Sequence, residues 1–154
     1  MTAITMTPIG TVHSARAEPI DDDWDSVETT IELDPAQFTP DATASLGDFS
    51  HIEVVFYFDR VPDGEIHAGA RHPRGRKDWP PAGIFAQRGK GRPNRIGVTA
   101  CRLLSVEGLT LTVRGLDAID GTPVLDVKPV MHGFLPRGDI REPQWAKELM
   151  AGYW

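Results

Sequence analysis

The chain has 154 residues, of which 40% are hydrophobic and 25% charged, and its formal net charge is −6. This length suits one domain with a sizeable core, and no stretch resembles a secretory signal or approaches the roughly 20 apolar residues of a membrane helix. Cys101 is the only cysteine, which excludes an internal disulfide and favours a reducing, cytoplasmic setting. Its apolar surroundings predict a small core residue.

Most of the predicted elements are strands joined by tight turns. Residues 30–33 and 52–58 (IEVVFYF) are rich in β-branched or aromatic side chains, and residues 35–38 (PAQF) suggest one helical turn. A long strand is predicted over residues 96–106, followed by a turn at Glu107–Gly108 and an alternating strand over residues 109–116. A tight turn at Asp120–Gly121 then precedes a strand over residues 122–130.

One helix is predicted, within the last stretch "EPQWAKELMAGYW", because Pro143 suits a first helical turn and Trp145, Leu149 and Met150 can share one face. Many short strands with little helix indicate a mainly β domain, either a barrel or a sandwich. Residues 59–94 show no regular pattern, and so long a loop in a compact domain is usually functional or disordered.

Charge is distributed unevenly along the chain. Residues 1–65 contain 14 acidic residues and two basic ones, whereas residues 71–95 contain eight basic residues and one acidic one. Such clustering indicates an anionic partner, although a solvated arginine-rich loop is the simpler alternative. Trp79 lies within the cluster, where it either stacks on an unpaired base or packs under Pro80–Pro81.

The stretch "RGKGRPNRIG" (residues 88–97) invites comparison with a nucleotide phosphate loop. Such a loop requires G-x-x-x-x-G-K-[ST] before a helix, but Ile84 stands where the first glycine belongs and Gly91 where the hydroxyl residue belongs. The residues that follow are strand-like, so no helix N-terminus would face a phosphate. No dinucleotide fingerprint or metal-ligand pattern is present either, so no metal is expected.

Three carboxylates, Asp117, Asp120 and Asp126, surround the predicted turn at Asp120–Gly121. A carboxylate pair can carry out acid–base chemistry. Alternatively, Asp120 forms the turn and Asp126 pairs with a cation. The residues by themselves therefore predict a β-rich domain with a basic, anion-binding loop.

Two blocks of the chain, "GIFAQRGKGRPNRIG" (residues 83–97) and "RGLDAIDGTPVLDVKP" (residues 114–129), resemble the TsaA/TrmO-like (YaeB-like) family. "IGTVHS" (residues 9–14) and the apolar strand after Ser50–His51 resemble it in kind and order. The resemblance implies a single β-barrel domain over residues 1–154 that binds S-adenosylmethionine and forms a homodimer, with the cofactor near the subunit interface. It also implies methylation of N6 of threonylcarbamoyl-adenosine at position 37 of tRNA. The alternatives are a methyltransferase that acts on a small molecule or another non-tRNA acceptor, and a non-catalytic module that binds S-adenosylmethionine or RNA.

The resemblance also implies roles for individual residues. Arg88 is expected to bind the cofactor, because an arginine fork suits its carboxylate. The backbone of the L-D-x-x-D-G block is expected to hold the adenosyl group, and Asp117 or Asp120 to lie near the sulfonium. The expected cofactor-binding residues are Asp59, Arg60, Arg88, Leu116, Asp117, Ala118, Ile119 and Asp120.

The acceptor side is less closely matched to the family. Asp126 is the candidate for accepting the adenine proton, with Lys128 beside it, although the two residues can equally form a structural pair. The expected RNA contacts are Lys77, Lys90, Arg92, Asn94 and Arg95. This chain has Gly89 where the family has serine and Arg95 where the family has a second proline. The additional C-terminal domain of longer relatives is expected to be absent.

Overall fold

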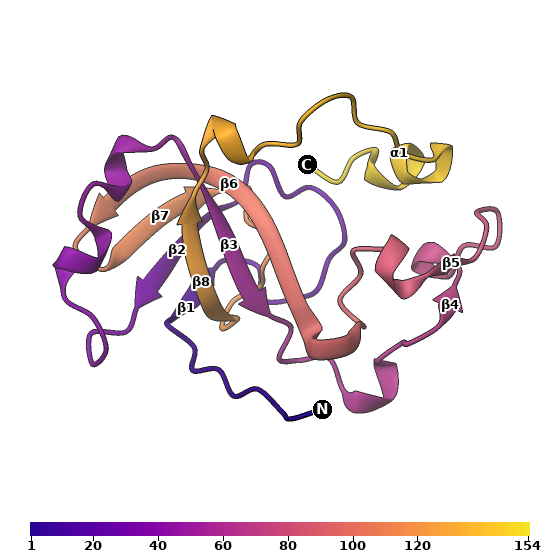
Figure 1. Cartoon of the computed structure of the whole chain (residues 1–154), viewed down its shortest axis with the longest axis horizontal. Helices are drawn as coiled ribbons and strands as arrows, with labels where there is room; N and C mark the ends of the chain where they lie inside the picture. Colours follow the sequence, from indigo (N-terminus) through magenta and orange to yellow (C-terminus); the bar gives the residue numbers. More distant parts are fainter.

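Six antiparallel strands close into a barrel, around which they follow the order β1, β2, β7, β6, β3, β8 (Figure 1). The computed structural model describes all 154 residues, Met1–Trp154. The prediction of a mainly β domain is confirmed, and of the two architectures that the strand pattern allowed, the protein has the barrel. The barrel strands are β1 (Gly10–Ser14), β2 (Glu28–Leu33), β3 (His51–Tyr57), β6 (Ile96–Glu107), β7 (Thr110–Arg114) and β8 (Pro123–Pro129).

The five predicted strands correspond to β2, β3, β6, β7 and β8, with ends that differ by up to two residues. The turn at Glu107–Gly108 joins β6 to β7, and Gly108 has a φ of 62°, which favours glycine. The sequence pattern did not predict β1. Residues 35–38 form a hydrogen-bonded turn that begins at Asp34 and is not a helix.

Alternating side chains fill the barrel interior. The pairing of β3 with β6 places Ile52 opposite Cys101 and Val54 opposite Thr99, and all four side chains are buried. Phe56, in the same inward-facing row of β3, is 1% exposed. Cys101 belongs to this core, as its apolar surroundings predicted. The intervening residues of each strand therefore face outward, as the period of two in a strand requires.

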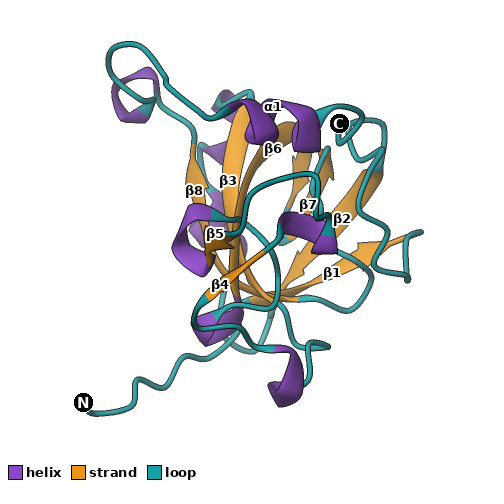
Figure 2. Ribbon diagram, turned by 90° about the vertical axis from the view of Figure 1, so that its right-hand side faces the viewer, coloured by secondary structure: helices purple, strands orange, loops and turns teal.

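The long segment between β3 and β6 is folded beside the barrel. It contains a two-stranded sheet, β4 (Ala70–Arg71) with β5 (Ala82–Gly83), and several 3-10 turns. Helix α1 (Gln144–Met150) lies next to this segment, as Figures 1 and 2 both show. The 3-10 turns of the whole chain are Pro40–Thr43, Leu46–Asp48, Asp63–Glu65, Pro73–Gly75, Ile84–Ala86, Pro93–Arg95 and His132–Phe134.

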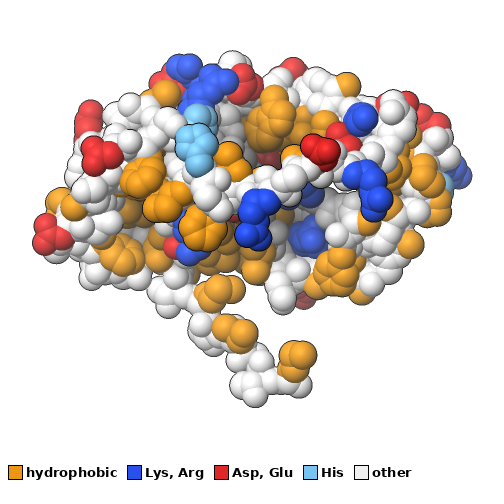
Figure 3. Space-filling view, turned by 45° about the horizontal axis from the view of Figure 1, so that its top comes forward, with side chains coloured by type: hydrophobic (Ala, Val, Ile, Leu, Met, Phe, Trp, Pro, Cys, Tyr) orange, Lys and Arg blue, Asp and Glu red, His pale blue; other side chains and the backbone are white.

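The first residues form an extended arm that stands away from the barrel, with exposed hydrophobic side chains at Met1, Ile4 and Met6 (Figure 3). None of the helices has the length and apolar character needed to cross a membrane.

Candidate functional site

Arg88 and Asp117, which come from the two distant sequence blocks, contact neighbouring residues of β6. The Arg88 guanidinium donates a hydrogen bond through Nη2 to the carbonyl oxygen of Val98, at 2.7 Å. The next residue, Thr99, donates its hydroxyl to Oδ1 of Asp117. The register of β6 with β7 pairs Arg102 with Arg114, and its continuation past the end of β7 places Asp117 opposite Thr99.

The second oxygen of Asp117 is bound by a residue from the end of the chain. The Tyr153 hydroxyl donates to Oδ2 of Asp117, so both oxygens of this carboxylate have a donor. Burial raises the pKa of the Tyr153 phenol, and the negative charge of Asp117 raises it further, whereas Arg74 and Arg88 oppose this rise. These four side chains are therefore close enough to influence one another, and Tyr153 stays protonated as a donor.

The L-D-A-I-D-G block ends in a turn that is fixed to β1. Oδ1 of Asp120 accepts the backbone N–H of Ser14 at 3.0 Å, and Gly121 has a φ of 83°. Asp120 therefore forms the turn, and β7 and β8 are not paired as a hairpin. The Arg60 guanidinium lies against this turn and donates to the carbonyl oxygen of Asp120 at 2.9 Å. Two residues expected at the cofactor are thus in direct contact.

The other expected cofactor residues differ in what they can offer a ligand. The side chains of Leu116 and Ala118 are buried in the core, so only their backbone groups can face a ligand. Ile119 is half-buried, and its carbonyl oxygen accepts the Thr122 hydroxyl at 2.7 Å. Asp59 follows β3 and is exposed. These positions agree with an expectation that the block contributes mainly backbone.

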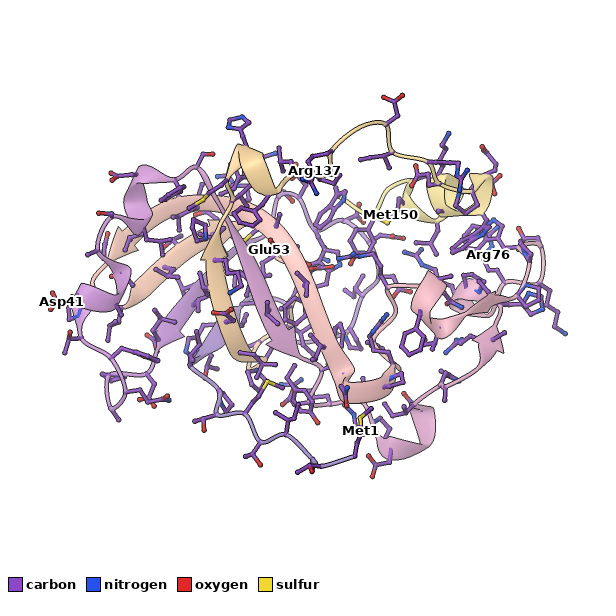
Figure 4. All side chains as sticks on the ribbon, viewed as in Figure 1. Met1, Asp41, Glu53, Arg76, Arg137 and Met150 are labelled. Carbon is purple, nitrogen blue, oxygen red and sulfur yellow. The ribbon has the colours of Figure 1, made fainter.

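The two residues expected to be catalytic, Asp126 and Lys128, lie elsewhere. They form an ion pair on β8 with 2.7 Å between Lys128 Nζ and Asp126 Oδ2, and this pair raises the pKa of Lys128. Asp126 is opposite Val55 and Lys128 opposite Glu53, both in the outward-facing row of β3 (Figure 4 labels Glu53). Thr99 faces inward, so the ion pair and the carboxylate of Asp117 belong to different faces of the sheet.

Several cations of the basic segment are already paired within the protein. Arg74 binds Asp22 at 3.0 Å, Arg76 binds Asp78, and Arg95 binds Asp63. The Arg95 side chain is only 19% exposed and also donates to the carbonyl oxygen of Val61. The expectation that Arg95 is free to meet RNA is therefore corrected, because its charge joins the loop to residues 61–63.

Four other basic-loop residues remain available to a partner. Arg92 is half-buried, and its Nη1 donates to the carbonyl oxygen of Gln87 at 2.7 Å. Lys77, Lys90 and Asn94 are exposed. Figure 3 shows basic and acidic side chains scattered over the visible face without one large basic patch. The anion-binding surface is therefore smaller than the sequence suggested. No cluster of three or more His, Cys, Asp or Glu side chains is arranged to hold a metal ion.

Residues 11–134 match the family described as the tRNA-methyltransferase O N-terminal domain. The chain belongs to this family. Over 141 residues it is 34% identical to a protein of Pyrococcus abyssi named "Probable S-adenosyl-L-methionine-binding protein", with 88% of this chain and 70% of that protein aligned. It is 40% identical over 89 residues to the mouse tRNA (adenine(37)-N6)-methyltransferase. This alignment covers 58% of this chain and 20% of the mouse protein.

The structure of TrmO from P. aeruginosa has the same fold, with a TM-score of 0.76 and 28% sequence identity. The similarity covers 94% of this chain and 62% of the TrmO chain. The chain thus spans less than two thirds of the length of that TrmO chain and has the fold of the N-terminal domain that defines the family.

One position that differs from the family pattern has a distinctive backbone in this TrmO-type domain. Asn94 and Arg95 have φ angles of 63° and 51°, in the left-handed region. Proline has a φ near −65°, so it cannot adopt the Arg95 conformation. Gly91 is required nearby, because a Cβ there would lie 2.5 Å from the carbonyl oxygen of Glu65. Arg95 therefore occupies a backbone conformation that proline could not adopt at this position.

Trp79 is not available for stacking on a base in this TrmO-type domain. Its side chain is 5% exposed, and its Nε1 donates to Oε2 of Glu148 on α1 at 2.9 Å. The Arg76 guanidinium covers the ring at 4.0 Å from its centre, and Figure 4 shows Arg76 beside α1. Trp79 is thus a structural residue, packed by α1 and Arg76. Its burial agrees with the packing alternative, and Glu148 and Arg76 are two of its partners.

Proposed function

We propose that the protein is an S-adenosylmethionine-dependent methyltransferase that acts on N6 of an adenine in tRNA. The observation that carries this proposal is that Arg88 and Asp117 are hydrogen-bonded to the adjacent residues Val98 and Thr99. The two residues are separated by 29 positions and belong to the two blocks that resemble the family. The names of the Pyrococcus and mouse relatives support the cofactor and the reaction, respectively.

The residues of this cluster suit the chemical groups of the cofactor. Arg88 keeps guanidinium N–H groups beyond its bond to Val98, and these suit a carboxylate. The carboxylate of Asp117 would stabilise a nearby cation such as a sulfonium. The bound cofactor supplies an activated methyl group for in-line displacement. The protein's contribution is then chiefly to position the reactants and exclude water, which can account for much of the rate enhancement.

The exposed side chains of the basic segment suit the phosphates of an RNA acceptor. Lys77, Lys90, Arg92 and Asn94 are the proposed contacts, and Arg95 positions the loop that carries three of them. We propose threonylcarbamoyl-adenosine at position 37 as the specific acceptor. The Asp126–Lys128 pair is assigned a structural role, because it lies on the outer face of β8.

Cofactor binding is tested by calorimetry with S-adenosylmethionine and the Arg88→Ala variant. The wild-type protein is expected to bind at micromolar concentrations, and the variant at least about tenfold more weakly, because a charge-assisted hydrogen bond is worth about 1.5–3 kcal/mol. Arg102→Ala is the matched control: Arg102 is also exposed and lies on β6, but it pairs with Asp25. Absence of binding by the wild-type protein would refute the proposal.

The acceptor is tested by nucleoside mass spectrometry of tRNA from cells with and without the gene. The methyl group on N6 of the position-37 nucleoside is expected to disappear without the gene and to return with the wild-type copy. Unchanged tRNA together with cofactor binding would assign the methyltransferase to another acceptor.

Homodimer formation and a cytoplasmic location also stay predictions. Light scattering of the purified protein tests the first, and fractionation of cells tests the second.

A further inference from the structure

Residues 144–154 are attached to the candidate site at three separate places. Trp79 donates its indole N–H to Glu148 on α1. The backbone N–H groups of Asp23 and Trp24 donate to the carbonyl oxygens of Gly152 and Tyr153, at 3.1 and 3.0 Å. The Tyr153 hydroxyl then reaches Asp117. Residues 144–154 thus connect three parts of the protein: the residues between β3 and β6, the acidic residues before β2, and the L-D-A-I-D-G block.

Asp117 has no other side-chain donors than those from Thr99 and Tyr153. Thr99 belongs to the barrel wall and holds one oxygen of the carboxylate. Rotation about the Cβ–Cγ bond would break both hydrogen bonds, so the pair of donors fixes the carboxylate plane. Without Tyr153, only the hydroxyl of Thr99 would restrain it.

Tyr153 is suited to restraining the Asp117 carboxylate because its hydroxyl stays protonated and can donate a hydrogen bond. Its ring packs edge-to-face against Trp154, with 4.8 Å between the ring centres, and its side chain is partly buried. Burial and the charge of Asp117 both raise the pKa of the phenol, so it does not ionise at physiological pH. The contact is therefore a charge-assisted hydrogen bond throughout the working range.

We infer that Tyr153 is a positioning residue for the cofactor: it holds the Asp117 carboxylate in the orientation that the cofactor meets, and residues 144–154 hold Tyr153 in place. This inference rests on the proposed function. It adds a residue that no motif of the sequence indicated and assigns the C-terminal segment to the site.

The direct test is the Tyr153→Phe variant, which removes only the hydroxyl. The KM for S-adenosylmethionine and the calorimetric Kd are expected to rise about tenfold, because a carboxylate restrained only by Thr99 has to be ordered when the cofactor binds. The KM for tRNA and the kcat at saturating cofactor are expected to stay within about twofold of wild type. The matched control is Tyr57→Phe, because the Tyr57 hydroxyl accepts only a long bond of 3.5 Å from Arg95.

A second variant leaves the Tyr153 and Asp117 side chains unchanged and tests whether residues 144–154 hold Tyr153 in place. Glu148→Ala removes the acceptor of the Trp79 indole and is expected to raise the KM for S-adenosylmethionine about threefold, with the tRNA KM unchanged. Unchanged cofactor affinity in Tyr153→Phe would overturn the inference, as would an equal change in both KM values. Failure of the wild-type protein to bind the cofactor would instead refute the proposed function.

Discussion

Cys101 shows how the barrel interior affects a single ionisable side chain. It is 3% exposed and faces the core, and burial together with the charge of Asp117 raises the pKa of its thiol from 9.0 to about 12. The unfolded chain therefore loses this proton near pH 9, whereas the folded protein keeps it. The free energy of unfolding falls as the pH rises wherever the folded state binds more protons than the unfolded state.

The wild-type protein should consequently lose up to about 2 kcal/mol of unfolding free energy between pH 8 and pH 10.5 through this thiol alone. Urea unfolding at the two pH values measures the loss. Cys101→Ala is the control, because other groups titrate equally in both proteins. An equal fall in the wild type and the variant would show that the thiol does not contribute.

Two glycines of the "RGKGRPNRIG" stretch are expected to differ in how strongly an alanine substitution destabilises the protein. A Cβ at Gly97 would lie 2.6 Å from the ring of Phe56 and 2.9 Å from that of Phe58, whereas no heavy atom lies within 4 Å of a Cβ at Gly89. Gly97→Ala should destabilise the protein by about 1–3 kcal/mol through overpacking. Gly89→Ala should leave the urea midpoint nearly unchanged. Similar midpoints for the two variants would contradict the close packing of β6 against these rings.

At the scale of elements, the loop before β6 depends on a backbone that proline cannot adopt. The N–H of Arg95 donates to the carbonyl oxygen of Arg92 at 3.0 Å, and its φ is 51°. Arg95→Pro loses both this hydrogen bond and the backbone conformation. Arg95→Gly also loses the ion pair with Asp63, but glycine accepts a positive φ.

The proline variant should therefore be less stable than the glycine variant by about 3 kcal/mol or more, as measured by urea unfolding. Comparing the two variants cancels the contribution of the ion pair. If the proline variant were as stable as the glycine variant, the loop would have a second path of equal free energy, and the left-handed turn would not be needed to hold it.

The elements that the sequence could predict are those whose pattern is local. The apolar rows of β3 and β6 have the required period, so their positions were predicted within two residues. β1 was missed because its five residues, Gly10–Ser14, become a strand by pairing with β2 and β8. The approach to β2 is so close that a Cβ at Gly10 would lie 2.4 Å from the carbonyl oxygen of Glu32. The strand character of β1 is a property of the closed barrel.

The difference between local patterns and long-range contacts also explains which residues of the candidate site could be predicted from the sequence. Arg88 and Asp117 could be proposed because they occur in long family-like blocks. Tyr153 could not, because its contact with Asp117 depends on how α1 docks, and an aromatic residue near a chain end carries no local signal. Asp126 and Lys128 also required the structure, since only the strand register shows that their side chains face outward.

At the scale of the whole molecule, two ion pairs join the acidic N-terminal half to the basic segment. Arg74 pairs with Asp22, and Arg95 pairs with Asp63. The acidic N-terminal half therefore holds part of the basic segment in place. What remains for a partner is a set of exposed cations, chiefly Lys77 and Lys90, in a protein of net charge −6.

Binding of tRNA should then be salt-dependent and carried by few contacts. Each neutralised phosphate contributes a slope of about −0.7 to −0.9 to a plot of log affinity against log salt concentration. Replacing Lys77 and Lys90 together by alanine should make the slope shallower by about 1.5, weakening binding most at low salt. Fluorescence anisotropy with labelled tRNA at several salt concentrations measures it. Arg114→Ala is the control, because Arg114 pairs with Glu28 on the neighbouring strand. Equal slopes for the lysine variant and the wild type would place the RNA on another face.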